Sequence, residues 1–194
     1  MTRPLPDLDP KSTALILIDL QKGIVAAPTQ PRPSSEVIHN GVRLAQAARD
    51  SGALVVLVHV SFERDGGDIL RTDTDEQPPS LRAPGWDELV GELQPLADVV
   101  VTKRQWGAFY GTNLDLELRR RGRKTIVLGG ISTNFGVEST ARAAWERSYQ
   151  LVLVEDAMAA RSADDHTFAV TRIFPRLGRI CGTEDVLKAW GTKT

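Results

Sequence analysis

The stretch KTIVLGGISTNFGVESTARAAWERSY, residues 124–149, contains the pattern that decides the fold. A β-branched run at 124–129 passes through a pair of glycines into a segment where apolar residues recur at helical spacing: Val137, Ala141, Ala144 and Trp145. The pattern predicts a buried strand that turns tightly into a helix, which is where α/β enzymes often mount a nucleophile. Gly136 lies in the first helical turn, so this turn presents backbone there and no thiol or hydroxyl.

Similar apolar runs without polar alternation occur along the chain, at 14–19, 54–60, 98–102 and 151–155, with a weaker run at 178–181. Such runs are typical of strands that are buried on both faces of a parallel sheet. Helical patterns lie between them, as in the segment around Ile38, Val42 and Ala45. This alternation predicts the α/β class, with a doubly wound, three-layer α/β/α sandwich around a mainly parallel sheet of six strands.

The composition restricts the function classes. A chain of 194 residues suits a single domain spanning 1–194, and a net charge of −1 implies no broad basic surface for nucleic acid. No apolar run is long enough for a membrane span or a signal peptide, and the lone Cys181 permits no internal disulfide. We therefore expect a cytoplasmic protein that binds neither membrane nor nucleic acid. The three scattered histidines and the absence of a nucleotide-binding motif predict no metal and no cofactor.

The segment 61–85 departs from this compact pattern, because it is long, polar and rich in Pro, Gly and Asp. Loops of this length are usually functional lids or irregular insertions, and the sequence favours neither.

Two charged residues follow predicted strands, at the sheet edge where open α/β sheets bind ligands. Asp19 directly follows the apolar run ALILI. Partial desolvation at such a position raises the pKa of a carboxyl towards values that suit acid–base catalysis. Capping of the next turn explains Asp19 equally well. Lys103 follows the third strand and could stabilise negative charge or hold Asp19 ionised. Taken alone, a solvated lysine beside Arg104 is the simpler interpretation.

Two further features can form a binding site. Trp106, Phe109 and Tyr110 stand among small residues and suggest a pocket wall, though core packing explains them nearly as well. The turn after 125–128 contains Ser132, Thr133 and Asn134 as candidate helix caps. The backbone amides of the first helical turn, near Gly136, can bind an oxyanion or carboxylate. The alternative interpretation is an ordinary capped helix, in which the glycine only allows close packing.

Taken together, the segments LILIDLQ (15–21), VTKRQWGAFYGTNL (101–114) and 129–157 resemble the isochorismatase-like (cysteine) hydrolase family, and most closely its YecD-type subgroup. The resemblance spans residues 13–190. It implies the strand order 3-2-1-4-5-6, assembly into a homo-oligomer and a catalytic triad of Asp, Lys and Cys. Asp19 and Lys103 match the first two members, and Gly136 stands in the cysteine position. The Ile131–Ser132 bond matches a position that is often a cis peptide in the family.

The missing thiol excludes covalent amide hydrolysis of the family's usual kind. The isochorismatases themselves also have glycine there and cleave a vinyl ether by protonation and addition of water. The resemblance therefore implies a hydrolase of a small, anionic substrate that acts through Asp19 and Lys103. Trp106, Phe109, Ile131, Ser132 and Asn134 would bind that substrate.

Other interpretations stay open at this stage. Arg64, Arg71 and Arg82 of the long loop are possible partners for substrate carboxylates, and are equally well explained as solvated. The chain could also be a catalytically silent member that binds a small ligand or a partner. An amidase that recruits Cys181 has little support, because no activating neighbour is evident.

Overall fold

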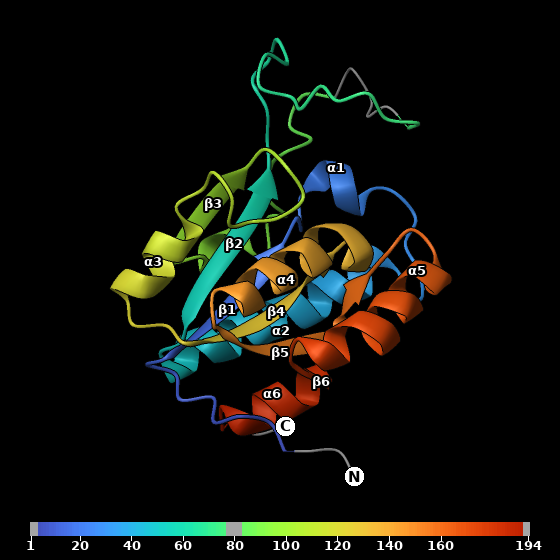
Figure 1. Cartoon of the computed structure of the whole chain (residues 1–194). Coiled ribbons are helices and arrows are strands. Elements are labelled where there is room, and N and C mark those ends of the chain that lie inside the picture. The colour runs from blue at the N-terminus through green and yellow to red at the C-terminus, as the bar shows by residue number, and fades with distance from the viewer. Residues whose placement is uncertain (1–3, 77–82, 192–194) are drawn as a thin grey trace.

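A computed structural model describes residues 4–76 and 83–191 (Figure 1). Six strands form one sheet: β1 (Thr13–Ile18), β2 (Leu54–Val60), β3 (Val99–Lys103), β4 (Thr125–Ile131), β5 (Gln150–Ala159) and β6 (Arg179–Cys181). All pairings are parallel and the order is β3-β2-β1-β4-β5-β6, as the resemblance implied. The prediction of fold class and strand order is confirmed.

Six α-helices and four short helical turns lie between and after the strands within the described ranges. The α-helices are α1 (Lys22–Val25), α2 (Ser34–Ser51), α3 (Leu114–Arg120), α4 (Glu138–Glu146), α5 (Ala163–Phe168) and α6 (Thr183–Ala189). The turns are the 3-10 helices η1 (Gln94–Leu96) and η4 (Phe174–Arg176) and the π-helical turns η2 (Thr133–Val137) and η3 (Ala169–Ile173). Among the described residues, no helix is both long and apolar enough to cross a membrane.

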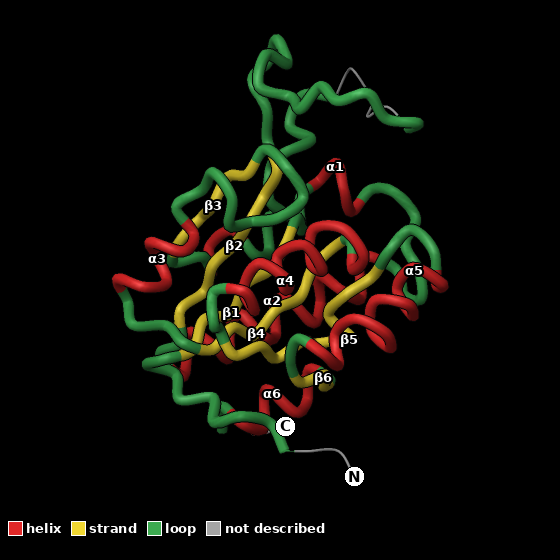
Figure 2. Tube along the Cα trace, viewed as in Figure 1, coloured by secondary structure: helices red, strands yellow, loops and turns green. Residues whose placement is uncertain are grey.

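The helices cover both faces of the sheet, as Figure 2 shows. Alternate residues of β1 point to opposite faces, so Leu15 and Leu17 pack under α2 and α6 while Ile16 and Ile18 pack under α3, α4 and η3. The four central strands β1, β2, β4 and β5 thus contribute to two apolar cores, which explains why their sequences show no polar alternation. This arrangement leaves the carboxyl ends of β1 to β5 as one edge from which the loops emerge (Figure 1).

Two aromatic residues lie at the surface, and for Trp145 this corrects its predicted place in the apolar helical pattern of Val137, Ala141 and Ala144. Trp145 of α4 is 54% exposed, because it lies about 100° around the helix from Ala144, the last residue of the buried stripe. Phe168 ends α5 and is 59% exposed, since the π-helical turn η3 resets the helical face and places Ala169 and Phe174 inside instead.

Candidate active site

Asp19 and Lys103 form a buried ion pair at the carboxyl edge of the sheet. Lys103 is the last residue of β3 and Asp19 follows β1, so the lysine side chain spans the intervening strand β2. Lys103 Nζ lies 2.8 Å from Asp19 Oδ2 and also donates to the Gln105 carbonyl at 3.0 Å. The exposed fractions are 5% for Asp19 and 2% for Lys103, so Lys103 is not a solvated surface lysine.

The state of Asp19 suits acid–base chemistry. Burial raises the pKa of its carboxyl from 3.8 to about 6, although the Lys103 ammonium opposes the rise. The second oxygen, Oδ1, is buried and has no hydrogen-bond partner in the described part of the chain. The backbone of Asp19 has φ 53°, a conformation that costs free energy for a non-glycine residue and tends to be retained at functional sites. Asp19 therefore keeps its proton up to a higher pH than an ordinary carboxyl, and one of its oxygens has no hydrogen-bond partner among the described residues.

Gly136 lies directly against this carboxyl. It belongs to η2, and a Cβ atom built on it would stand 3.1 Å from Asp19 Oδ2 and 2.9 Å from Ile18 Cγ2. The Thr140 hydroxyl donates to the Gly136 carbonyl at 2.7 Å and accepts the Ala108 amide at 3.1 Å, which fixes the turn. The site therefore has no room for the missing side chain unless Ile18 or Asp19 shifts.

Gly130 explains how the turn comes so close to β1. Its φ of 125° is rarely adopted by other residues, and a Cβ there would lie 2.2 Å from the Ile18 carbonyl oxygen. Only glycine permits this approach of β4 to β1. Asp19 and Gly136 therefore lie in contact across the β1–β4 pair, and the Ile131–Ser132 bond is cis, as the resemblance implied.

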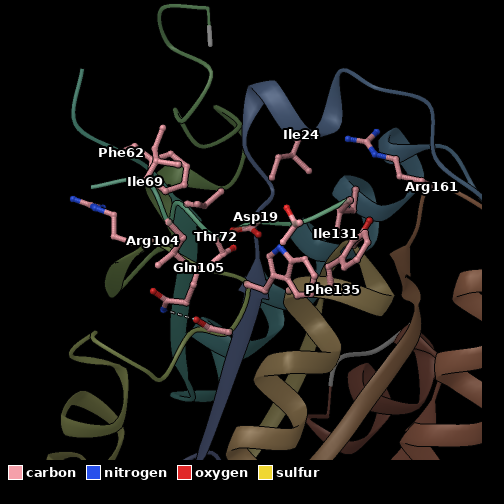
Figure 3. Close-up of a pocket in the computed structure, with 17 residues that line it drawn as sticks. Asp19, Ile24, Phe62, Ile69, Thr72, Arg104, Gln105, Ile131, Phe135 and Arg161 are labelled. Carbon is pink, nitrogen blue, oxygen red and sulfur yellow. Dashed lines mark hydrogen bonds between the residues drawn. The ribbon is translucent and has the colours of Figure 1, made fainter. Parts of the chain in front are cut away.

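A cavity of about 730 Å³ opens above Asp19 (Figure 3). Its lining is mainly apolar, with a few polar groups, as is usual for small-molecule sites. The lining residues come from four parts of the chain: Asp19 and Ile24 after β1; Val60, Phe62, Ile69, Leu70, Thr72 and Thr74 from the end of β2 and its loop; Arg104, Gln105, Trp106 and Gly107 after β3; and Ile131, Ser132, Phe135, Gly136 and Arg161 after β4 and β5.

The residues predicted to bind substrate divide between cavity and core. Trp106, Ile131 and Ser132 line the cavity, and Trp106 packs against Phe135 with ring centroids 4.7 Å apart. Phe109 does not line it, which corrects its predicted role as a pocket wall. It is buried against Tyr149 at 5.8 Å, because the turn after Trp106 leads the chain back into the core under α3 and α4.

Two other members of those predicted groups also lie outside the lining. Asn134 precedes the cavity residue Phe135, and its Oδ1 is buried without a partner, so its binding role stays a prediction. Tyr110 is 80% exposed and likewise does not line the cavity, so it forms no part of the wall that the sequence suggested.

The first half of the long loop forms one wall of the cavity. Phe62, Ile69 and Leu70 line it, and Asp68 pairs with Arg104 after β3, which fastens the loop beside the site. Of the arginines suggested as substrate partners, Arg64 and Arg71 are exposed and do not line the cavity, and Arg82 lies outside the described residues. The loop therefore contributes apolar surface to the site.

Several cavity residues were not predicted from the sequence. Arg161 is one of them, and among the described residues of the lining it is the only charged side chain without an ion pair. It follows the carboxyl end of β5 by two positions, so the strand-end rule that identified Asp19 could have found it. Phe135 lies one residue before Gly136. It was not predicted as a cavity residue, because this segment was expected to be the first turn of an ordinary capped helix. Ser132 and Asn134 provide no side-chain cap, and the Thr133 hydroxyl instead contacts His166 Nδ1 at 2.9 Å in the core.

Two other chemistries have no support in the described ranges. No group of three His, Cys, Asp or Glu residues that could hold a metal occurs among residues 4–76 and 83–191. Cys181 lies in β6, away from the cavity lining, and burial raises the pKa of its thiol to about 12. Such a thiol is almost entirely protonated at neutral pH and is a poor nucleophile.

The chain belongs to the isochorismatase-like hydrolase family, because the model of the isochorismatase domain matches residues 13–185. It is 46% identical over 186 residues to the isochorismatase family protein YwoC of Bacillus subtilis, covering 94% of this chain and 96% of that protein. It is 44% identical to YecD of Escherichia coli O157:H7 over 185 residues, covering 94% and 98%. An isochorismatase family protein of Burkholderia thailandensis has a similar structure, with a TM-score of 0.91, 47% identity and coverage of 97% and 100%.

Proposed function

We propose that this protein hydrolyses a small anionic molecule by acid–base chemistry at Asp19, without a covalent thiol intermediate. The observation that carries the proposal is the Asp19 carboxyl itself: it adjoins the cavity, its pKa is raised to about 6 by burial, and its Oδ1 has no hydrogen-bond partner among the described residues. A carboxyl with a pKa near the working pH is well suited to donate a proton in the transition state.

The proposed step is protonation of the substrate by Asp19, followed by addition of water to the resulting cation-like carbon. In an enol ether, the proton adds to the alkene carbon, water attacks the carbon bonded to the ether oxygen, and the hemiketal collapses to an alcohol and a carbonyl. Lys103, held 2.8 Å from Oδ2, stabilises the carboxylate that remains after proton transfer. A proton from the added water restores Asp19.

The geometry supports this route over nucleophilic catalysis. Gly136 supplies no nucleophile. Ser132 has a hydroxyl in the cavity lining, but no described imidazole or carboxylate accepts a hydrogen bond from it, so it has no base to activate it. Binding of an anion is supported by Arg161, which adjoins the cavity and forms no ion pair with a described acid. Assembly into a homo-oligomer and a cytoplasmic location stay predictions.

Purified protein should be assayed on isochorismate and on a panel of smaller enol ethers, with release of the carbonyl product as the signal. Asp19→Asn keeps the shape of the side chain and removes the proton donor, so we expect turnover to fall roughly 100-fold or more. Cys181→Ala should retain full turnover, since the thiol lies outside the cavity. Binding without turnover, or turnover that Asp19→Asn leaves unchanged, would contradict the proposal.

A further inference from the structure

The charged side chains of the cavity are not equivalent. Asp19 is paired with Lys103, which is itself buried behind it and does not line the cavity. Arg104 is paired with Asp68, and in Figure 3 its guanidinium is directed away from the cavity. Both of these pairs are already satisfied by the protein.

Arg161 differs from both. Its only hydrogen bond with a described residue runs from Nη1 to the neutral Pro28 carbonyl at 3.3 Å, and no described carboxylate lies within ion-pair distance. In Figure 3 its guanidinium is directed towards Ile24, across the cavity above Asp19. A guanidinium is planar and presents a fork of donors that matches a carboxylate. The remaining donors of Arg161 are therefore available to a ligand that enters the cavity.

The surfaces between Arg161 and the opposite wall are apolar. Trp106 and Phe135 present a pair of rings, tilted 45° to each other, and Ile131 adjoins them. Ile69 of the long loop lies on the other side of the cavity from Phe135 (Figure 3), and its neighbour Leu70 also lines the cavity. Trp106 and Leu70 are 63% and 62% exposed, so a ligand that covers them removes much apolar surface from water.

We infer that the substrate is a flat, largely apolar molecule with a single carboxylate, which pairs with Arg161 while the body lies on Trp106 and Phe135. This inference rests on the proposed function only for the placement of the reacting bond beside Asp19. A single unpaired cation lines the described part of the cavity, so a second carboxylate would lie near Asp19 without a partner. The site is therefore expected to favour monoanions over dianions of the same shape.

Binding of trans-cinnamate, a flat aromatic monocarboxylate, tests the inference without turnover. Titration calorimetry compares it with the neutral isostere cinnamamide and with the dianion 4-carboxycinnamate. We expect cinnamate to bind roughly fivefold to tenfold more tightly than cinnamamide, as a hydrogen-bonded ion pair at a partly exposed arginine allows. The dianion should bind no more tightly than cinnamate.

Variants assign the preference to one side chain. Arg161→Gln should abolish the advantage of cinnamate over cinnamamide, and Arg161→Lys should retain part of it. Arg71→Gln removes the same charge from the loop outside the cavity lining, so it should leave the advantage intact. Arg104→Gln tests the other arginine of the lining, and loss of the preference in that variant alone would overturn the assignment.

The remaining outcomes are also decisive. Failure of cinnamate to bind, equal binding of acid and amide, or tighter binding of the dianion each contradicts the inferred substrate class. The same titrations in Asp19→Asn separate this inference from the proposed function, because the preference for a carboxylate should survive there while turnover is lost. A site that hydrolyses enol ethers without preferring a carboxylate would refute the inference alone.

Discussion

A methyl group at position 136 should destabilise the protein, although glycine to alanine in a helix normally stabilises it. The added Cβ would lie 2.9 Å from Ile18 Cγ2 and 3.1 Å from Asp19 Oδ2, closer than packed side chains allow. Overpacking of this kind costs about 1–3 kcal/mol, and the lower backbone entropy of alanine offsets about 0.5–1 kcal/mol. The difference spans about 0–2.5 kcal/mol, so we expect Gly136→Ala to lose about 1 kcal/mol of unfolding free energy, or roughly 2–4 °C in Tm for a chain of this size.

Urea denaturation and thermal melts measure the loss, with Gly91→Ala as the matched control. A Cβ at Gly91 would have no atom within 4 Å, so that variant should be neutral or slightly stabilised. Since Ile18 Cγ2 makes the closest contact, the penalty of Gly136→Ala should shrink when Ile18→Ala removes that methyl group. Equal stability of the two glycine variants, or a penalty that Ile18→Ala leaves unchanged, would refute the argument that the site has closed around the glycine.

Three other outcomes follow from the described contacts. Burial holds the folded-state pKa of Asp19 near 6, above its ordinary 3.8, so its contribution to stability is full below about pH 4 and lost as pH rises through 6. Asp19→Asn does not titrate, so urea denaturation should show its stability relative to the parent improving by about 2 kcal/mol between pH 4 and pH 8, and a pH-independent difference would contradict the raised pKa. Cys181 should react with a disulfide reagent at pH 8 much more slowly in the folded protein than in urea, because its thiol pKa is about 12 in the folded protein; equal rates would contradict the raised pKa. Phe109→Ala should lose about 3–5 kcal/mol of unfolding free energy, because Phe109 is buried. Trp106→Ala should lose little stability but weaken cinnamate binding. The reverse result would indicate that Phe109, and not Trp106, contacts the ligand.

The sheet was predictable because its central strands are buried on both faces. A run such as LVVLVHV at 54–60 shows no alternation of apolar and polar residues. Where such runs alternate with helical patterns along the chain, a parallel sheet covered by helices on both faces is the expected fold. Aromatic side chains at the surface were harder to place. Trp145 and Phe168 continue apolar stripes in the sequence, and only the helix rotation and the π-helical turn η3 show that they face outwards.

The site was predictable only in part, for a related reason. Asp19 stands at a strand end, where position alone indicates the ligand-binding edge. Lys103 comes from the edge strand β3, and its reach across β2 depends on side-chain length and on the Gln105 carbonyl, neither of which is visible in residue spacing. Phe135 and the loop residue Ile69 enter the cavity through backbone turns that periodicity does not encode.

The dependence of turnover on pH tests the central claim most directly, namely that Asp19 acts as a proton donor in a site without a thiol. With the best enol ether of the panel, kcat/KM should be constant at low pH and fall tenfold per pH unit above about 6, as the Asp19 proton is lost. Asp19→Asn should remove this activity, whereas Cys181→Ala should reproduce the parent profile. A profile that is flat through pH 6, or activity that depends on Cys181 and survives in Asp19→Asn, would contradict the account.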